Sequence, residues 1–222
     1  MDKNLEKHVV KTGTLTVGIV CKDGIILAAD NRQTYASGNA VAYIAGTADK
    51  VSKINERIIV TTAGGASDTR KVISHVKAEI RLKELKSKQK VGLKNVASLM
   101  SNMLFQNIRR PSMIPSIAHF LIAGYDDTGI GLYEVSPDGY LQKIETYRAT
   151  GAPFESLGIF DVEYTPKITL EEGIKLAKKV FRATMGRQPG VGDGFDIYTI
   201  KKGEIKKVSS QKVSNEMVDK SK

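Results

Sequence analysis

The order of helix and strand patterns limits this chain to few folds, because amphipathic stretches occur as two consecutive pairs with strand patterns before, between and after them. The first pair covers 67–85 and 93–108, where apolar residues recur at helical spacing, and it ends before Pro111. The second pair covers 153–162 and a helix that opens with a capping box at 169–172. This order predicts an α+β protein in which two helical layers cover two antiparallel sheets, a four-layer αββα sandwich.

Strand patterns are the β-branched and apolar runs between turn residues. We expect an opening hairpin that turns at Asp23-Gly24 and a closing hairpin that turns at Lys202-Gly203. Ser67 or Asp68 is the expected N-cap of the first helix. The predicted strands are 14–22, 25–31, 57–63, 117–124, 129–135, 141–148, 195–201 and 204–208.

Length and composition predict one domain, since 222 residues with 41% hydrophobic side chains can bury one sizeable core and no repeat or linker interrupts them. We place this domain at 14–208. The leader before it, 1–13, is charged throughout and lacks the apolar stretch of a secretory signal. The charged, Ser-rich segment 209–222 is expected to be a flexible tail.

The formal net charge of +10 raises the question of nucleic acid or an anionic membrane as a partner. Lys and Arg are spread along the chain, densest at 81–94 and after Lys201, and no aromatic residues interleave with them to stack on bases. No apolar run approaches the roughly 18 residues of a membrane helix. We therefore expect a solvated basic surface, with neither nucleic acid nor membrane as a partner.

The single cysteine, Cys21, has no partner for an internal disulfide and follows a β-branched run. Such a residue is typically a small buried hydrophobe, so it is expected to serve packing rather than catalysis. A reducing cytoplasm fits this cysteine usage best.

Thr14 follows Gly13 at the boundary between the leader and the first strand, so cleavage of that bond would make threonine the new amino terminus. A free α-amine, with a reference pKa of about 8, can then act as base for the hydroxyl of the same residue. Such a site also needs a cation, a carboxylate and N–H donors for the oxyanion, for which Lys50, Asp30 and Gly64 are candidates.

From pattern alone, a simpler interpretation is open for each residue. Thr14 is then an ordinary strand threonine, Asp30 a solvated carboxylate at a strand end, and Lys50 a surface lysine. Spacing by itself does not decide between the two interpretations.

The sequence K-T-G-T-L-T-V-G-I-V-C-K-D-G-I-I-L-A-A-D-N-R at 11–32 resembles the amino terminus of proteasome β subunits, in which a leader ending in Gly precedes Thr. Similar motifs follow in order along nearly the whole chain: D-K-V-S-K-I, T-T-A-G, S-N-M-L, A-G-Y-D and T-G-A-P-F. The resemblance implies the N-terminal-nucleophile hydrolase fold. It also implies a threonine endopeptidase that removes its own leader at Gly13-Thr14.

Carried over by position, the resemblance makes Thr14 the nucleophile and its own base, Asp30 the carboxylate that orients the lysine, and Gly64 the oxyanion donor. Lys50 is the cation that lowers the amine pKa. We choose it over Lys53 because it keeps the family's distance to T-T-A-G, which leaves a short insertion after Asp30. Four uncharged positions are expected to line the pocket for the residue before the cut bond: Gln33, Ala48, Thr62 and Ala66.

Two motifs depart from the family pattern. Active members carry T-G-S-G-S-P where this chain has T-G-A-P, with Ala152 in the region of the missing serine. They also carry R-D-S-x-S-G where this chain has Gln188 for the aspartate and Val191 for the second serine. These losses remove polar groups that would position the amine.

Two hypotheses follow: an active threonine protease, or a catalytically weak or inactive subunit that supports an active paralogue in a mixed β ring. By resemblance, either one assembles with α-type and other β subunits in stacked seven-membered rings. These would act on unfolded polypeptides, with a regulatory ATPase engaged through the α ring. The expected location is the cytoplasm, in an archaeal-type particle. Neither a metal nor an organic cofactor is expected, because the chain supplies every group that the chemistry needs.

Overall fold

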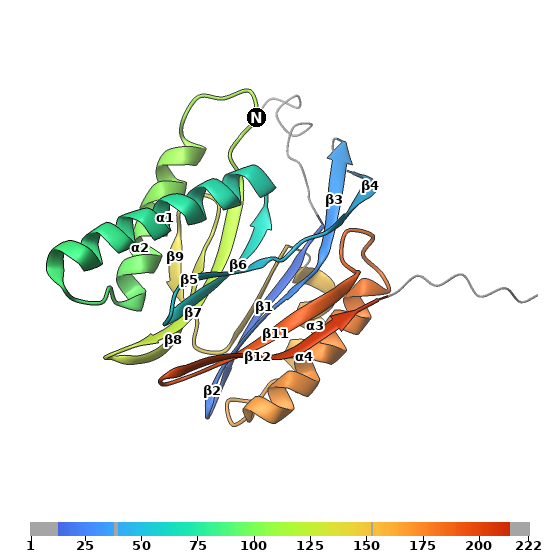
Figure 1. Ribbon diagram of the computed structural model, residues 1–222. Helices are drawn as coiled ribbons and strands as arrows, with labels where there is room; N and C mark the ends of the chain where they lie inside the picture. Colours follow the sequence, from blue (N-terminus) through green and yellow to red (C-terminus); the bar gives the residue numbers. More distant parts are fainter. Residues whose placement is uncertain (1–12, 38–39, 152, 214–222) are drawn as a thin grey trace, which may run out of the picture.

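The computed structural model describes residues 13–37, 40–151 and 153–213, and within them two five-stranded antiparallel sheets stack between two pairs of helices (Figure 1). The first sheet has the strand order β10-β1-β2-β11-β12 and the second the order β5-β6-β7-β8-β9. The first sheet consists of β1 (Leu15–Cys21), β2 (Gly24–Asp30), β10 (Tyr147–Gly151), β11 (Gly194–Lys201) and β12 (Glu204–Lys212). The second consists of β5 (Val51–Asn55), β6 (Ile58–Gly64), β7 (Ala118–Asp126), β8 (Gly129–Val135) and β9 (Leu141–Lys143).

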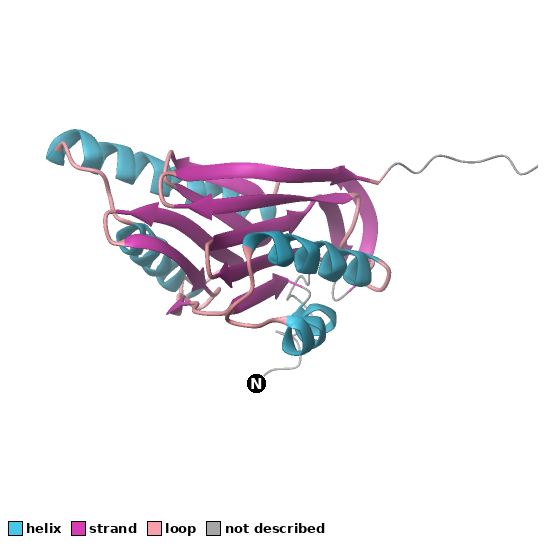
Figure 2. Cartoon of the chain, turned by 90° about the horizontal axis from the view of Figure 1, so that it is seen from below, coloured by secondary structure: helices cyan, strands magenta, loops and turns pink. Residues whose placement is uncertain are grey.

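Each sheet carries helices on its outer face. The helices α1 (Ala66–Ser87) and α2 (Leu93–Ile108) pack on the second sheet, whereas α3 (Pro153–Glu163) and α4 (Leu170–Met185) pack on the first. Figure 1 shows the two helical pairs on opposite sides of the strands, and Figure 2 shows the same stack from below. The predicted α+β class and αββα sandwich of antiparallel sheets are confirmed.

Three apolar clusters hold these layers together: one between the two sheets and one beneath each helical pair. Burying one large apolar side chain contributes about 1.5–3 kcal/mol, so these clusters dominate the stability of the fold. Their fully buried members include Leu27 and Leu121 between the sheets, Phe181 of α4 with Phe195 of β11, and Met100 of α2 with Phe120 of β7.

The helix predictions are largely confirmed. The bounds of α2 are those predicted, and α4 has the predicted capping box, in which Thr169 and Glu172 each bond the other's backbone N–H. The predicted cap of α1 is wrong. Gly65 is the N-cap and makes no side-chain bond, because the helix begins at Ala66 and includes Ser67 and Asp68 in its first turn.

Two strand predictions need correction. Gly24 pairs with Cys21, so the opening hairpin turns at Lys22-Asp23 rather than at Asp23-Gly24. A Cβ on Gly24 would lie 2.7 Å from the Ile200 carbonyl oxygen, so close packing rather than the turn requires glycine there. The predicted strand 141–148 is in fact two strands, because the chain crosses from the second sheet, where β9 pairs with β8, to the first, where β10 pairs with β1.

Three strands have no counterpart in the sequence predictions. The strand β5 pairs with β6, and β3 (Arg32–Ser37) pairs with β4 (Ala40–Thr47) in a separate two-stranded ribbon that projects beyond the sheets (Figure 1). The Tyr35 and Tyr43 rings stack on this ribbon at 5.3 Å between centroids. The insertion expected between Asp30 and Lys50 therefore lies in a hairpin.

The tail prediction is wrong for its first residues. The strand β12 continues to Lys212, where Gly194 pairs with it, so 209–212 belong to the first sheet. These residues are polar because β12 is an exposed edge strand, and its backbone bonds to β11 need no apolar side chains. The rest of the predicted tail, from 214, and the leader up to residue 12 lie outside the described residues.

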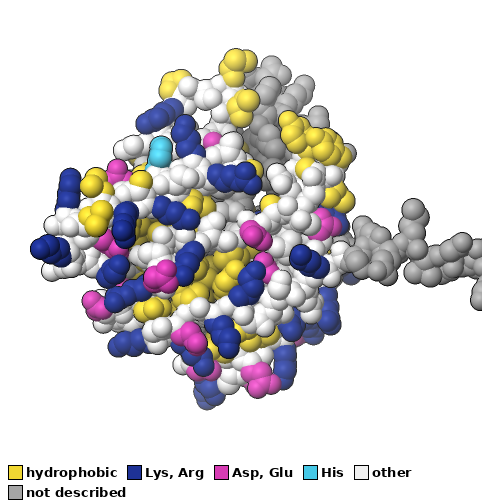
Figure 3. All heavy atoms as spheres, in the orientation of Figure 1, with side chains coloured by type: hydrophobic (Ala, Val, Ile, Leu, Met, Phe, Trp, Pro, Cys, Tyr) yellow, Lys and Arg dark blue, Asp and Glu magenta, His cyan; other side chains and the backbone are white. Residues whose placement is uncertain are grey.

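The surface in Figure 3 carries Lys and Arg side chains scattered among acidic and neutral ones over the face shown. This distribution agrees with the expected solvated basic surface. Among the described residues, no helix combines the length and the apolar character needed to cross a membrane.

Candidate active site

Thr14 lies directly before β1 and is almost completely buried, with 5% of its surface exposed. Backbone contacts fix it on both sides. The N–H of the next residue, Leu15, donates to Asp30 Oδ1 at 3.0 Å, and a Cβ on Gly151 would lie 2.0 Å from the Thr14 carbonyl oxygen. The Gly151 backbone, with φ +90°, therefore packs directly against Thr14.

Asp30 ends β2, the strand between β1 and β11, and its side chain is fully buried. Three backbone N–H groups donate to it: Leu15 to Oδ1, and Arg32 and Gly192 to Oδ2, at 3.1 and 3.2 Å. Burial raises the pKa of the Asp30 carboxyl, and Lys50 and the backbone donors oppose that rise. The carboxylate is thus held in one orientation by fixed dipoles.

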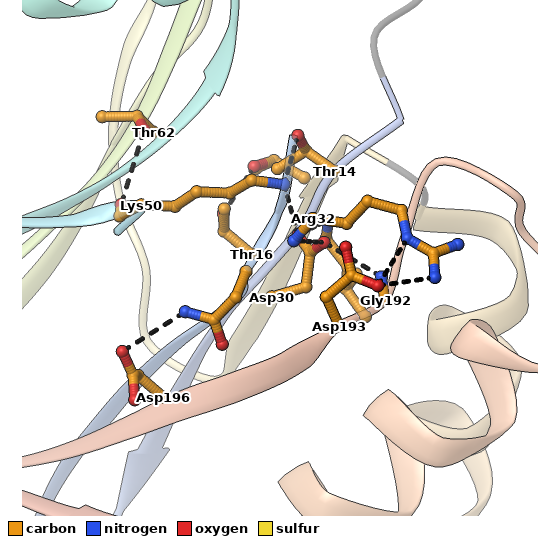
Figure 4. A network of polar contacts seen from close by, with 12 residues as sticks. Thr14, Thr16, Asp30, Arg32, Lys50, Thr62, Gly192, Asp193 and Asp196 are labelled. Carbon is orange, nitrogen blue, oxygen red and sulfur yellow. Dashed lines mark hydrogen bonds and ion pairs between the residues drawn. The ribbon is translucent and has the colours of Figure 1, made fainter. Parts of the chain in front are cut away.

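Lys50 precedes β5 and reaches into the same buried site. Its Nζ donates to Asp30 Oδ1 at 2.7 Å and to Thr14 Oγ1 at 3.0 Å (Figure 4). Its carbonyl oxygen accepts the N–H of Thr62, so pairing between the start of β5 and β6 sets its position. Burial lowers the pKa of Lys50, and the Asp30 carboxylate opposes that shift. A lysine with a lowered pKa can act as a base at a hydroxyl.

The alternative lysine, Lys53, lies elsewhere. Its Nζ pairs with Glu56 on the surface, with 55% of its side chain exposed. The choice of Lys50 from the spacing to T-T-A-G therefore identified the lysine that contacts Thr14.

Gly64 ends β6 on the wall of the cleft that contains Thr14 and Lys50. Its φ is +107°, and a Cβ there would lie 2.3 Å from the Ile117 carbonyl oxygen. The positive φ and the close approach of Ile117, the residue directly before β7, both require glycine at this position.

A cleft of about 160 Å³ opens beside Thr14. All four predicted pocket residues line it: Gln33, Ala48, Thr62 and Ala66. The four residues predicted from the sequence are all uncharged, whereas the lining in the structure also includes the charged residues Asp49 and Arg70. The cleft can therefore contact charged as well as neutral side chains.

Sequence reasoning missed the pair formed by Arg32 and Asp193. Arg32 Nε and Nη2 donate to Asp193 Oδ1 at 3.2 and 2.8 Å, and Nη1 donates to the Pro189 carbonyl at 2.8 Å. Figure 4 shows this pair beside Gly192, whose N–H reaches Asp30. The signal in the sequence was Arg32 itself, which is the last residue of the A-D-N-R motif.

The described residues contain no group of three or more His, Cys, Asp or Glu side chains arranged to hold a metal ion. The site instead combines a hydroxyl, an amine and a buried carboxylate in one hydrogen-bonded row, from Thr14 through Lys50 to Asp30. Such a row can remove the hydroxyl proton and return it to a leaving group, which is the requirement for acyl transfer to an alcohol.

Comparison with known proteins gives consistent matches. A family model described as "Proteasome subunit" matches residues 10–200. The chain is 33% identical over 210 residues to the "Proteasome subunit beta" of Archaeoglobus fulgidus, covering 94% of each chain. It is 32% identical over 205 residues to the protein of that name from Archaeoglobus profundus, covering 92% of each. A third, from Methanocaldococcus vulcanius, is 32% identical over 204 residues, covering 91% of this chain and 88% of the relative.

Proposed function

This chain belongs to the proteasome subunit family, and from that membership we propose that it is a β-type subunit that cleaves peptide bonds with Thr14 as nucleophile. One observation carries the proposal: Lys50 Nζ lies 3.0 Å from Thr14 Oγ1 and 2.7 Å from Asp30 Oδ1. The pairing of a hydroxyl with a buried, carboxylate-bound amine is otherwise costly to maintain.

The first reaction is removal of the leader. In the intact chain the nitrogen of Thr14 is an amide, so Lys50 is the titratable group available to accept the hydroxyl proton. Thr14 Oγ1 attacks the carbonyl carbon of Gly13, the C–N bond breaks, and Lys50 returns the proton to the nitrogen of Thr14. Water then hydrolyses the resulting ester, which releases the Gly13 carboxylate and restores the hydroxyl.

The second reaction is turnover of peptide substrates. The α-amine freed at Thr14 now stands beside its own hydroxyl, and Lys50 lowers the amine pKa by its charge. Attack on the substrate carbonyl gives an ester and releases the amine product, and water completes hydrolysis. The Gly64 N–H is the proposed donor to the oxyanion. Gln33, Ala48, Thr62 and Ala66 are the proposed contacts of the side chain before the cut bond.

The direct test is Thr14→Ala in a core particle assembled with its α and β partners. We expect the chain to keep Met1 to Gly13 by intact mass and to show no peptidase activity. The control is Thr146→Ala, at an exposed threonine between β9 and β10. A Thr14→Ala particle with full peptidase activity would refute the proposal.

A second candidate function is a weak or inactive subunit that supports an active paralogue. The observation in its favour is Val191, which is fully buried in the apolar cluster beneath α4 where the family pattern has a serine. Of the two other altered positions, Gln188 lies in the same loop as Val191, and Ala152 lies outside the described residues. A particle with this chain as its sole β subunit separates the two: leader removal and peptide turnover in it would exclude the inactive role.

Partners follow from family membership, which implies assembly in a proteasome core with other subunits. We propose stacked seven-membered rings with α-type and other β subunits, unfolded polypeptides as substrates, and a regulatory ATPase engaged through the α ring. We also propose that the particle works in the cytoplasm.

A further inference from the structure

The residue before the proposed cleavage point is in direct backbone contact with the loop between α4 and β11. A Cβ on Gly190 would lie 2.2 Å from the Gly13 Cα, and a Cβ on Gly13 would lie 2.1 Å from the Gly190 Cα. Real Cβ atoms do not approach other atoms so closely, and here the obstacle is backbone on both sides. Neither glycine has the positive φ that would demand glycine for conformational reasons, so the requirement is one of space.

The loop that carries Gly190 is held on both sides of that residue. Arg32 donates to the Pro189 carbonyl on one side and to the Asp193 carboxylate on the other. Val191 is fully buried beneath α4, and the Gly192 N–H donates to Asp30. A side chain added at Gly190 would therefore displace Gly13 more readily than the loop.

The other end of the bond is equally confined, because Gly151 packs against the Thr14 carbonyl. Gly190 thus touches the residue before the bond, and Gly151 touches the residue after it. Gly151 has φ +90°, so a substitution there would strain the backbone by itself. Gly190 is the position at which crowding can be tested without that complication.

We propose that Gly190 is a positioning residue for leader removal. It holds the Gly13 carbonyl in the position in which the Thr14 hydroxyl can attack it, and it serves no role in turnover of peptides. This inference rests on the proposed function. Its physical basis is that displacement of a reacting group by about 1 Å costs on the order of 100-fold in rate. After cleavage Gly13 is gone, so its contact with Gly190 no longer exists.

The proposed role of Gly190 depends on the backbone of this loop, so it is compatible with the loss of the family's polar side chains there. Gln188 and Val191 replace polar residues, and the loop is anchored by burial of Val191 and by Arg32. The loop thus keeps a rigid backbone surface against Gly13. Its contribution to leader removal comes from shape rather than from side-chain hydroxyls.

The experiment compares two forms of the chain, each as wild type and as Gly190→Ala, assembled with the partner subunits. One form is the full chain. The other starts at Thr14, released from an amino-terminal ubiquitin fusion by a ubiquitin-specific protease, and it keeps every helix and strand that the structure describes. Leader removal is followed by intact mass, and peptidase kcat and KM and the melting temperature are measured on the form that starts at Thr14.

The matched control is Gly158→Ala, because a Cβ on Gly158 meets nothing within 4 Å. We expect it to process its leader at the wild-type rate. For Gly190→Ala we expect leader removal to slow by at least tenfold in the full chain. In the form that starts at Thr14, kcat, KM and melting temperature should stay close to wild type, within about twofold for the kinetic constants.

Normal leader removal by the Gly190→Ala full chain would overturn the inference. So would loss of peptidase activity or of folding in the Gly190→Ala form that starts at Thr14, since Gly190 would then serve the fold or turnover itself. Failure of the proposed function looks different, because wild type starting at Thr14 would then be inactive too. A wild-type full chain that keeps its leader while the form starting at Thr14 is active would overturn the inference and the proposed leader removal, but not the proposed turnover of peptides.

Discussion

Arg32 binds Asp193 through two N–H donors on one carboxylate oxygen, although the two residues lie 161 positions apart. Asp193 has φ +59°, which is unusual for a residue other than glycine, and Arg32 holds it there. The Gly192 N–H then points at Asp30. An ion pair outside the row formed by Thr14, Lys50 and Asp30 thus sets the position of one of the donors to Asp30.

Replacement of Arg32 by methionine should lower the free energy of unfolding by about 1.5–3 kcal/mol, because two hydrogen bonds to a mostly buried carboxylate are lost. Urea unfolding measures the change. The control is Arg57→Met, whose partner Asp127 is 97% exposed, and we expect a loss below about 1 kcal/mol there. Equal losses in the two variants would contradict the role given to Arg32.

Replacement of Lys50 by methionine should reduce leader removal by about 10²–10⁴-fold, since the group that accepts the hydroxyl proton is removed. It should also reduce peptidase activity, since the charge that lowers the pKa of the Thr14 α-amine is lost. Lys53→Met is the matched control, because Lys53 lies on the surface and should leave both rates unchanged. Lys50→Arg should fail in leader removal as well, because a guanidinium stays protonated and cannot accept the hydroxyl proton. Normal leader removal by Lys50→Arg would show that only the positive charge matters in that step.

The pH dependence of leader removal should follow the neutral fraction of Lys50. Burial lowers the pKa of Lys50 from its ordinary 10.5, so the amine loses its proton at a lower pH than a surface lysine does. The rate should rise about tenfold per pH unit and level off below pH 10.5. Single-turnover processing from pH 6 upward, with folding checked at each pH, gives the profile. A rate that falls as pH rises would indicate that Lys50 acts as an ammonium.

Cys21 should not react with thiol reagents in the folded protein. Burial raises the pKa of its thiol to about 12, with smaller contributions from Asp23 and Glu172. At pH 8 the thiolate fraction is then about 10⁻⁴. Iodoacetamide should leave both the mass and the peptidase activity unchanged, and should label Cys21 once the chain is unfolded in guanidinium. Inactivation of the folded particle by iodoacetamide would contradict the proposal that Thr14, and not Cys21, is the nucleophile.

Gly64→Ala should destabilise the protein by at least about 2 kcal/mol, because a positive φ and a clash with the Ile117 carbonyl oxygen act together. Gly203→Ala separates the two effects, since Gly203 has φ +88° but open space around its would-be Cβ. That control should cost about 1 kcal/mol. Thermal or urea unfolding of both variants provides the comparison, and equal effects would show that the clash is relieved by a small shift.

Local signals in the sequence were sufficient where a segment's own residues decide its structure. Apolar spacing located α2, and Thr169 with Glu172 located the start of α4. They were insufficient where distant pairing decides. The segment after Leu141 resembles one strand, but Tyr147–Gly151 pairs with β1, more than 120 positions away along the chain. The ribbon of β3 and β4 was also missed, because its Gly- and Ala-rich sequence lacks a strand pattern.

The candidate site shows the same division. Thr14, Asp30 and Lys50 lie in three separate parts of the chain. The chemistry of an N-terminal threonine made them candidates but left a simpler interpretation open for each, and the family resemblance pointed to the same residues. The Arg32–Asp193 pair could not be inferred, because neither residue's neighbours indicate a partner so far along the chain. The contact between Gly13 and Gly190 was hidden for a related reason: two glycines leave no side-chain pattern to recognise.

The position of Asp30 on a central strand has a consequence for the timing of protein synthesis. Its strand is flanked by β11, where Phe195 pairs with Asp30, and Gly192 supplies one of its hydrogen bonds. A nascent chain still attached to the ribosome can hold Thr14 and Lys50 yet lacks that neighbouring strand until nearly all residues have emerged. The candidate site can therefore form only when synthesis is nearly complete, so the proposed protease would stay inactive for most of the time that its own chain is being made.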